Sequence, residues 1–395
     1  MPGLAANIGN AVRYSLTYVT LPLVGVFSLQ TESYSWVALV RVGQQKRNRE
    51  LMSGRRVLIT GGAGFLGCNL ADHFIETSHD VVIFDNFYRR GVHHNVEWLR
   101  ERHGDRFTLI EGDLRDYQAL LRAADAAEAV YHVAGQTAVT TSVANPREDF
   151  EINALGTFNA LEAARHAADN PVFIFTSTNK VYGGMEDVAI VEEATRYAYV
   201  DHLWGIDESR PLDFHSPYGC SKGAADQYVR DYARIYGLPT VVFRMSSIYG
   251  PHQFGVEDQA WVAYFVIAAV KGWPITIYGD GKQVRDVLYV DDLVRAFELA
   301  TEHIDVSAGQ VYNIGGGPRN TLSIWVEFAP LLSQILGRPL KAASYSDWRP
   351  GDQRVYISDI RKAWRDFGWE PQAGVDEGLR RIAPWVLENQ ALFEP

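Results

Sequence analysis

The sequence has 395 residues, of which 47% are hydrophobic and 22% are charged, a balance that is ordinary for a globular enzyme with a large core. The formal net charge is −11, and acidic and basic residues are interspersed without a basic stripe, which argues against nucleic acid as a partner. The two cysteines, Cys68 and Cys220, are too few for a disulfide framework, and no His/Cys cluster has the spacing of a metal site.

The first 51 residues lack the pattern of the remaining chain. Their apolar stretches, 15–29 and 36–42, are shorter than the roughly 18–20 residues of a membrane span, and Pro22 interrupts the first. They also lack a clear signal-peptide arrangement. We therefore predict an N-terminal extension, 1–51, that is not part of the fold, with no membrane association and a cytoplasmic location.

An apolar run over 56–60 leads into a turn containing Gly61, Gly64 and Gly67, and residues 65–77 have the pattern of a helix. Glycines at this spacing permit a tight turn and let the backbone approach a pyrophosphate at the helix N-terminus. Glycine also serves simple strand-to-helix turns, but here the next strand, 80–84, ends in Asp85, where a carboxylate holds the adenosine 2′-hydroxyl of NAD. Because arginines stand at positions 89 and 90, NADP stays open as the alternative. The predicted cofactor-binding residues of this segment are Gly61, Gly64, Phe65, Leu66, Gly67, Asp85 and Asn86.

Apolar strands alternate with helical stretches along the chain, with further strands expected at 107–110, 128–132, 172–176, 239–244 and 310–314. This alternation predicts an α/β fold, a Rossmann-type doubly wound parallel sheet with a smaller C-terminal substrate-binding lobe. We expect an NAD-binding domain over 52–244, to which 286–316 returns. Residues 245–285 and 317–395 are expected to form the lobe that binds the substrate.

The chemistry is expected where the strand 172–176 ends in Ser177 and Thr178, and at a helix that Ser216 caps and Pro217 opens. On that helix Tyr218 and Lys222 lie one turn apart on the same face. A tyrosine ionises near pH ~10, so a neighbouring ammonium group and an oxidised nicotinamide ring must lower its pKa before it can remove a hydroxyl proton. Alternatively, Thr178 caps a strand end and Lys222 is a solvated helix lysine.

Taken together, these motifs resemble the extended short-chain dehydrogenases/reductases, in the branch of nucleotide-sugar epimerases and dehydratases, from about residue 53 to residue 385. The resemblance implies that Asp113 and Leu114 meet the adenine, that the small residues around Ala134 and Gln136 pass beneath the cofactor, and that Ser177 also contacts NAD. Tyr218 is then the acid/base, Lys222 lowers its pKa and binds the nicotinamide ribose, and Thr178 orients the substrate oxygen. Relatives commonly assemble as dimers or tetramers, so a homo-oligomer is expected.

Every enzyme of this branch first oxidises a sugar hydroxyl with NAD, and neighbouring residues decide the next step of the reaction. Dehydratases that resemble this chain carry a Glu shortly after the threonine, as do related decarboxylases, whereas Asn179 and Lys180 stand here. Epimerisation needs no such carboxylate, because the ketone turns over and takes the same hydride back. We therefore predict an epimerase that holds NAD between turnovers.

Segments 177–183, 212–228 and 281–288 resemble the 2-epimerase subgroup that acts on CDP-paratose and CDP-tyvelose. This implies inversion at C2 of a CDP-linked hexose through a 2-keto intermediate. Met245 and the segment 249–252 depart from the subgroup, so another CDP-sugar stays open as the substrate. A UDP-hexose 4-epimerase and, less favoured, a non-catalytic NAD-binding protein are the alternatives. The expected substrate-binding residues are Thr178, Asn179, Gln253, Arg285, Arg349 and Asp352, of which the two arginines suit the diphosphate.

Overall fold

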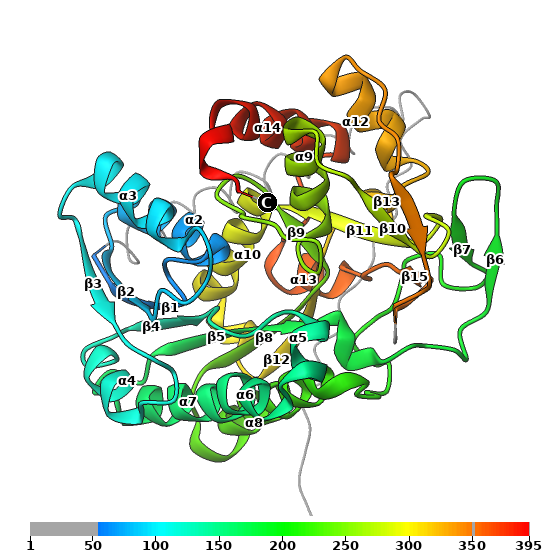
Figure 1. Ribbon diagram of the computed structural model, residues 1–395. Coiled ribbons are helices and arrows are strands. Elements are labelled where there is room, and N and C mark those ends of the chain that lie inside the picture. Colours follow the sequence, from blue (N-terminus) through cyan, green and yellow to red (C-terminus); the bar gives the residue numbers. More distant parts are fainter. Residues whose placement is uncertain (1–53, 350–351, 395) are drawn as a thin grey trace, which may run out of the picture. The chain divides into compact units, whose positions relative to one another are not determined.

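The computed structural model describes residues 54–349 and 352–394 (Figure 1). The predicted extension 1–51 lies outside the described residues. Among the described residues, no helix is long and apolar enough to cross a membrane.

A parallel sheet of seven strands forms the centre, in the order β12-β8-β5-β4-β1-β2-β3. The strand order reverses between β1 and β4, and ligands bind at such a switch point in open α/β sheets. The prediction of a doubly wound parallel sheet is confirmed. The strands are β1 (Arg56–Thr60), β2 (Asp80–Asp85), β3 (Phe107–Glu111), β4 (Ala129–His132), β5 (Val172–Thr178), β8 (Thr240–Met245) and β12 (Gln310–Ile314).

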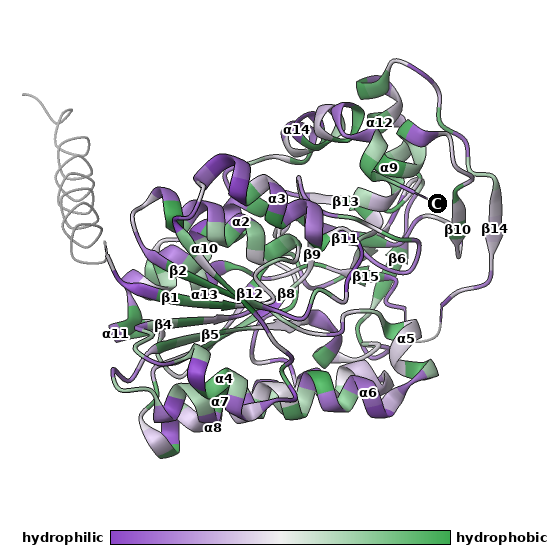
Figure 2. Cartoon of the chain, turned by 60° about the vertical axis from the view of Figure 1, so that its left-hand side comes forward, coloured by the Kyte–Doolittle hydropathy of each residue, from purple (hydrophilic) through white to green (hydrophobic). Residues whose placement is uncertain are grey.

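Helices cover both faces of this sheet, because successive strand residues point to opposite sides. In β1, Val57 and Ile59 belong to one core and Leu58 to the other, and all three are buried. Figure 2 shows strands of the sheet in green between helices that carry purple on their outer sides. The first face packs against α2 (Phe65–Glu76), α3 (Val92–His103), α10 (Val290–Glu302) and α13 (Arg361–Phe367), and the second against α4 (Tyr117–Ala123), α7 (Gly156–His166) and α8 (Ser216–Tyr236).

A separate apolar core lies beyond the carboxyl edge of the sheet and includes Phe265, Trp325 and Phe328. Because the two cores are separate, we propose the lobe boundaries expected from the sequence with one change: α13, within the expected lobe segment 317–395, packs against the sheet. The core is built around α9 (Trp261–Lys271), β10 (Thr276–Tyr278), β11 (Val284–Tyr289), α12 (Phe328–Leu336) and α14 (Val375–Glu388).

Short elements complete the described chain. Helical ones are α5 (Val139–Ala144), α6 (Pro146–Phe150), the π-helical turn η1 (Glu151–Leu155), α11 (Ile304–Ser307) and the 3-10 turns η2 (Asn179–Tyr182) and η3 (Gln390–Leu392). The strands are β6 (Ile190–Glu192), β7 (Tyr197–Tyr199), β9 (Ser247–Tyr249), β13 (Thr321–Ser323), β14 (Ser344–Ser346) and β15 (Val355–Tyr356).

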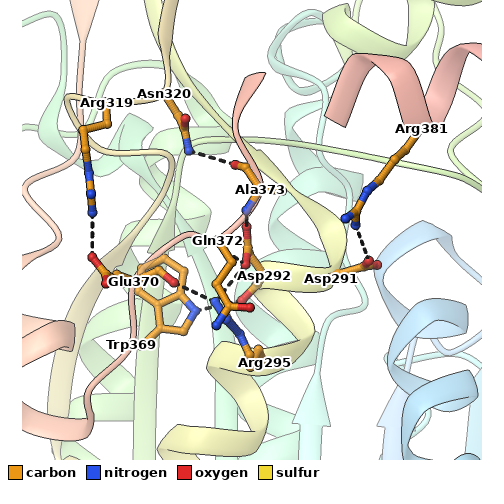
Figure 3. A network of polar contacts seen from close by, with 10 residues as sticks. All are labelled: Asp291, Asp292, Arg295, Arg319, Asn320, Trp369, Glu370, Gln372, Ala373 and Arg381. Atoms are coloured by element: carbon orange, nitrogen blue, oxygen red, sulfur yellow. Dashed lines mark hydrogen bonds and ion pairs between the residues drawn. The ribbon is translucent and has the colours of Figure 1, made fainter. Parts of the chain in front are cut away.

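Polar contacts join α10 to the C-terminal segment (Figure 3). The Asp292 carboxylate accepts hydrogen bonds from the backbone N–H groups of Gln372 and Ala373, at 2.9 and 3.0 Å, and its backbone carbonyl accepts one from Trp369 Nε1 at 2.8 Å. Because Asp292 and the Trp369 indole are buried, each polar group needs such a partner. The contacts fix the chain that leads from α13 into α14 against the sheet's helical layer.

Candidate active site

The glycine turn after β1 is closely packed. Gly61 has φ +71°, and a Cβ on Gly67 would lie 2.2 Å from the Gly61 carbonyl oxygen. The backbone of β1, the turn and α2 therefore approach one another as only glycine allows. Gly64 precedes α2, so the unpaired N–H groups of the helix start face the cleft, which suits a pyrophosphate. The geometry of this turn fits NAD.

Asp85 ends β2 beside that turn. Its carboxylate accepts hydrogen bonds from the backbone N–H groups of Ala63 at 3.0 Å and Phe87 at 2.9 Å, and burial raises its pKa. The Arg89 guanidinium donates to the Thr137 hydroxyl at 2.7 Å and also bonds Gln259. Arg89 thus bonds Thr137 and Gln259, whereas Asp85 accepts from backbone N–H groups, and an acid at the end of β2 favours NAD over NADP.

Asn86 and Asp113 lie together at the next strand ends, where the Asn86 amide donates to Asp113 at 3.0 Å. Two hydrogen bonds from Arg115, at 2.8 and 2.7 Å, hold the pKa of Asp113 below its ordinary range. After β4, the Gln136 side chain bonds the backbone of Ala138. These side chains are thus positioned by neighbours in their own loop or in the adjacent one.

Tyr218 and Lys222 lie one turn apart near the start of α8, as predicted. Ser216 caps the turn by accepting a hydrogen bond from the Gly219 backbone N–H at 3.2 Å, with its own φ at +67°. Both Tyr218 and Lys222 are buried, with exposed fractions of 7% and 4%. Thr178, the last residue of β5, shares a hydrogen bond with Tyr218.

Burial raises the pKa of Tyr218 to about 12, although the hydrogen bond with Thr178 and the charge of Arg89 lower it. In the protein alone, burial therefore outweighs the positive charge nearby, whereas the lowered pKa expected from the sequence also involves the oxidised nicotinamide ring. The Lys222 ammonium lies 4.2 Å from the centre of the Phe175 ring, and burial lowers its own pKa to about 7. The desolvated lysine therefore carries its charge poorly in the protein by itself.

On the far side of Thr178, Asp352 holds two cations. Arg285 donates to Asp352 Oδ1 at 2.6 Å, and Lys180 Nζ lies 3.7 Å from the same oxygen. Burial raises the pKa of Asp352, but Arg285 and Lys180 outweigh it and hold that pKa below its ordinary value. Asn179 donates to Gln353 at 3.1 Å, which ties the turn after β5 to this segment.

Arg349 lies against residues of the loop between β9 and α9. It pairs with Asp258 at 3.1 Å, donates to the Glu257 carbonyl at 3.0 Å and stacks over the Tyr278 ring at 4.0 Å. Gln253 donates to the Ile248 carbonyl at 3.1 Å, and its own side-chain oxygen is buried without a partner among the described residues.

One continuous cavity of about 1330 Å³ brings these groups together. Its volume exceeds the roughly 300–1,000 Å³ of a pocket for one drug-sized ligand, so it has room for a dinucleotide and a second ligand. Every predicted site residue lines it except Lys222, which lies behind the wall near Gly135. No group of three or more His, Cys, Asp or Glu that could hold a metal ion occurs in the described part of the chain.

Sequence reasoning missed the wall that Thr137, Glu257, Asp258, Gln259 and Tyr278 contribute to the cavity. These residues belong to loops and to a three-residue strand, and apart from Thr137, which lies in the subgroup-like segment 136–142, no motif in the sequence marks them. For Lys180 the sequence leaves open a salt bridge under the sugar or direct contact with it, and its ion-pair partner, Asp352, lies 172 positions away in the chain.

Comparison with known proteins places this geometry among related folds. Residues 57–315 match the model of the NAD dependent epimerase/dehydratase family. The chain is 44% identical to CDP-paratose 2-epimerase from Salmonella typhi, over 84% of this chain and 99% of that protein. The UDP-glucose 4-epimerase of Thermotoga maritima, solved with UDP-glucose, superposes with a TM-score of 0.72 at 32% identity, over 84% of this chain and 99% of that one. A dTDP-glucose 4,6-dehydratase from Streptomyces venezuelae with NAD bound gives 0.74 at 28% identity, over 86% and 99%.

Proposed function

The chain belongs to the NAD dependent epimerase/dehydratase family and is a nucleotide-sugar epimerase that uses NAD, and we propose that it inverts C2 of a CDP-linked hexose through a transient 2-keto intermediate. CDP-paratose or a related CDP-sugar is the proposed substrate. The identity of 44% with a CDP-paratose 2-epimerase, over nearly the whole length of that protein, supports C2 as the inverted carbon and CDP as the nucleotide. The ion pair between Lys180 and Asp352 is the observation that favours epimerisation over dehydration.

Dehydration requires a carboxylic acid or carboxylate beside the sugar that can exchange a proton. Beyond Thr178 the chain instead presents the amide of Asn179 and the ammonium group of Lys180. Asp352, the acid beside them, is paired with two cations and has a lowered pKa, so it stays ionised and engaged at neutral pH. Epimerisation makes no demand on such an acid, and this favours it over elimination.

We propose that Tyr218 and Thr178 handle the substrate hydroxyl. The Tyr218 oxygen takes the hydroxyl proton and returns it after the sugar has turned over, and the Thr178 hydroxyl holds the reacting oxygen beside it. When bound in the cleft that begins at Gly61, NAD supplies reversible hydride transfer and a positive ring charge. Because burial alone keeps Tyr218 protonated, positive charge in the loaded site is needed to make it a base.

The test is proton NMR of CDP-paratose, CDP-glucose and UDP-glucose incubated with the protein and no added NAD. We expect inversion at C2 of a CDP-sugar. Tyr218→Phe should lose turnover and keep its NAD, whereas Tyr228→Phe, on the same helix with 50% of its surface exposed, should behave as the unaltered protein.

A UDP-hexose 4-epimerase is the second candidate, favoured by the similarity to the Thermotoga maritima structure with UDP-glucose. Inversion at C4 of UDP-glucose, with no change at C2 of either CDP-sugar, would establish this candidate and overturn the first.

A further inference from the structure

Lys180 occupies a defined place in the cavity wall. It lies in η2, the turn that directly follows β5, and its backbone N–H donates to the Thr178 hydroxyl at 3.2 Å. Its side chain lines the cavity that Tyr218 and Thr178 also line, with 25% of its surface exposed. The short turn therefore holds Lys180 two residues after Thr178, which together with Tyr218 is proposed to face the reacting oxygen.

The hydrogen-bonding capacity of this ammonium group exceeds what Asp352 provides. A lysine has three N–H donors, and Asp352 Oδ1 already accepts a hydrogen bond of 2.6 Å from Arg285. Lys180 Nζ stays 3.7 Å from that oxygen, beyond hydrogen-bond distance, and in the described chain Asp352 is its one ion-pair partner. Donors of Lys180 are thus available to a ligand in the cavity.

Three cations, Lys180, Arg285 and Arg349, line this wall of the cavity. Lys180 is next to Thr178, Arg285 comes after it across Asp352, and Arg349 lies among residues of the loop before α9. Guanidinium groups offer a fixed fork that suits phosphate oxygens, whereas an ammonium group is compact and rotates freely about its stem. The lysine therefore suits a sugar, whose oxygens change place when the sugar rotates within the site.

We propose that Lys180 binds the sugar of the substrate, through a hydroxyl or keto oxygen, and that the diphosphate is left to Arg285 and Arg349. This inference rests on the proposed function and deepens it. Asp352 acts as the positioning residue that holds the ammonium group against the wall.

Lys180→Met, Lys180→Arg and Arg285→Met are compared in the NAD-loaded protein. For each variant, kcat and KM are measured with the nucleotide sugar that the enzyme turns over, and the Kd of the matching nucleotide diphosphate without sugar is measured by calorimetry. Lys180→Met should lower kcat/KM about tenfold or more, the size of one charge-assisted hydrogen bond, and change the Kd of the diphosphate less than about twofold. Arg285→Met should weaken both ligands.

Lys180→Arg, which keeps the charge and gives up the mobile donors, should lose more in kcat than in KM. Since Asp352 keeps Arg285 as a partner, Lys180→Met should fold and retain NAD, which thermal unfolding and acid extraction of NAD check. If Lys180→Met weakens the binding of the diphosphate and of the nucleotide sugar equally, Lys180 binds the diphosphate. If kcat/KM is unchanged, Lys180 only forms an ion pair with Asp352. Either result overturns the proposal. If the enzyme turns over UDP-hexoses and no CDP-sugar, the proposed CDP-sugar function is refuted. The variants would then be compared with the UDP-hexose and UDP, and this comparison would still test Lys180.

Discussion

A buried ion pair beneath the candidate site gives the sharpest test of what holds α8 in place. Arg244 on β8 makes two hydrogen bonds of 2.9 Å to the Asp226 carboxylate on α8, and Ser177 donates to the same carboxylate at 2.9 Å. Arg244 also donates to Tyr182, whose hydroxyl donates to Asn313 at 2.7 Å. Since Asp226 lies one helical turn after Lys222, the network fixes the helix that carries Tyr218.

Removing one partner leaves the other charge buried and unpaired. The exposed fractions are 0% for Asp226 and 2% for Arg244, so water cannot replace the lost partner. We expect Asp226→Leu to cost about 3–5 kcal/mol of the free energy of unfolding. With an unfolding entropy of about 2.1 cal/mol/K per residue over roughly 340 folded residues, this corresponds to a fall of about 4–7 °C in Tm.

The assay is thermal and urea unfolding of Asp226→Leu, Arg244→Met and the double variant, all at one saturating NAD concentration. The double variant should be more stable than the sum of the single losses predicts, because it removes both charges. Equivalent changes at the surface pair Arg380 and Asp376, whose side chains are 50% and 54% exposed, serve as the control and should leave Tm nearly unchanged. A loss below about 1 kcal/mol in Asp226→Leu, or strict additivity in the double variant, would refute the reasoning.

The site and the core support three further predictions. Gly67→Ala should yield folded protein without NAD, measured by acid extraction, because its Cβ would lie 2.2 Å from a carbonyl oxygen of the cofactor turn; NAD at wild-type occupancy would contradict this. Lys180, which faces Asp352 and Arg285, has its pKa lowered by burial to about 8, so kcat/KM should fall as pH rises through 8, and Lys180→Arg should lose this part of the pH dependence. His132 is buried and its pKa falls from 6.5 to about 3, so its contribution to stability is full above pH 6.5 and is lost as pH falls toward 3, on the order of 4–5 kcal/mol. Urea titrations between pH 7 and 4 should show this slope, and His132→Gln should flatten it.

The central sheet was predictable because its inner strands are short apolar runs buried on both faces, although the edge strand β3 is only partly buried. The strand expected at 56–60 is Arg56–Thr60, and the one expected at 172–176 extends two residues further, to Thr178. The helix expected over 65–77 ends at Glu76. Short strands such as β10 were beyond prediction, because β10 pairs with β14 some 68 positions away and three residues carry no periodicity.

Within the candidate site, sequence reasoning found the groups that share a local motif and missed the pairings made across the chain. Tyr218 and Lys222 are set by one helical turn, and Gly61 and Gly67 by one loop. The sign of the Tyr218 pKa shift could not be foreseen, because it depends on burial by residues distant in sequence. Nor does sequence spacing tell that Lys222 lies behind the cavity wall.

An epimerase that returns its own hydride must keep the keto-sugar and the cofactor together while the sugar rotates, and the contacts across the cavity bear on this requirement. The loop between β9 and α9 reaches the cofactor side through Gln259, which bonds both Arg89 and Thr137. The neighbouring Asp258 pairs with Arg349 on the substrate side at 3.1 Å. One loop thus ties the cofactor side of the cavity to its substrate side, and opening of this loop would break polar contacts on both sides.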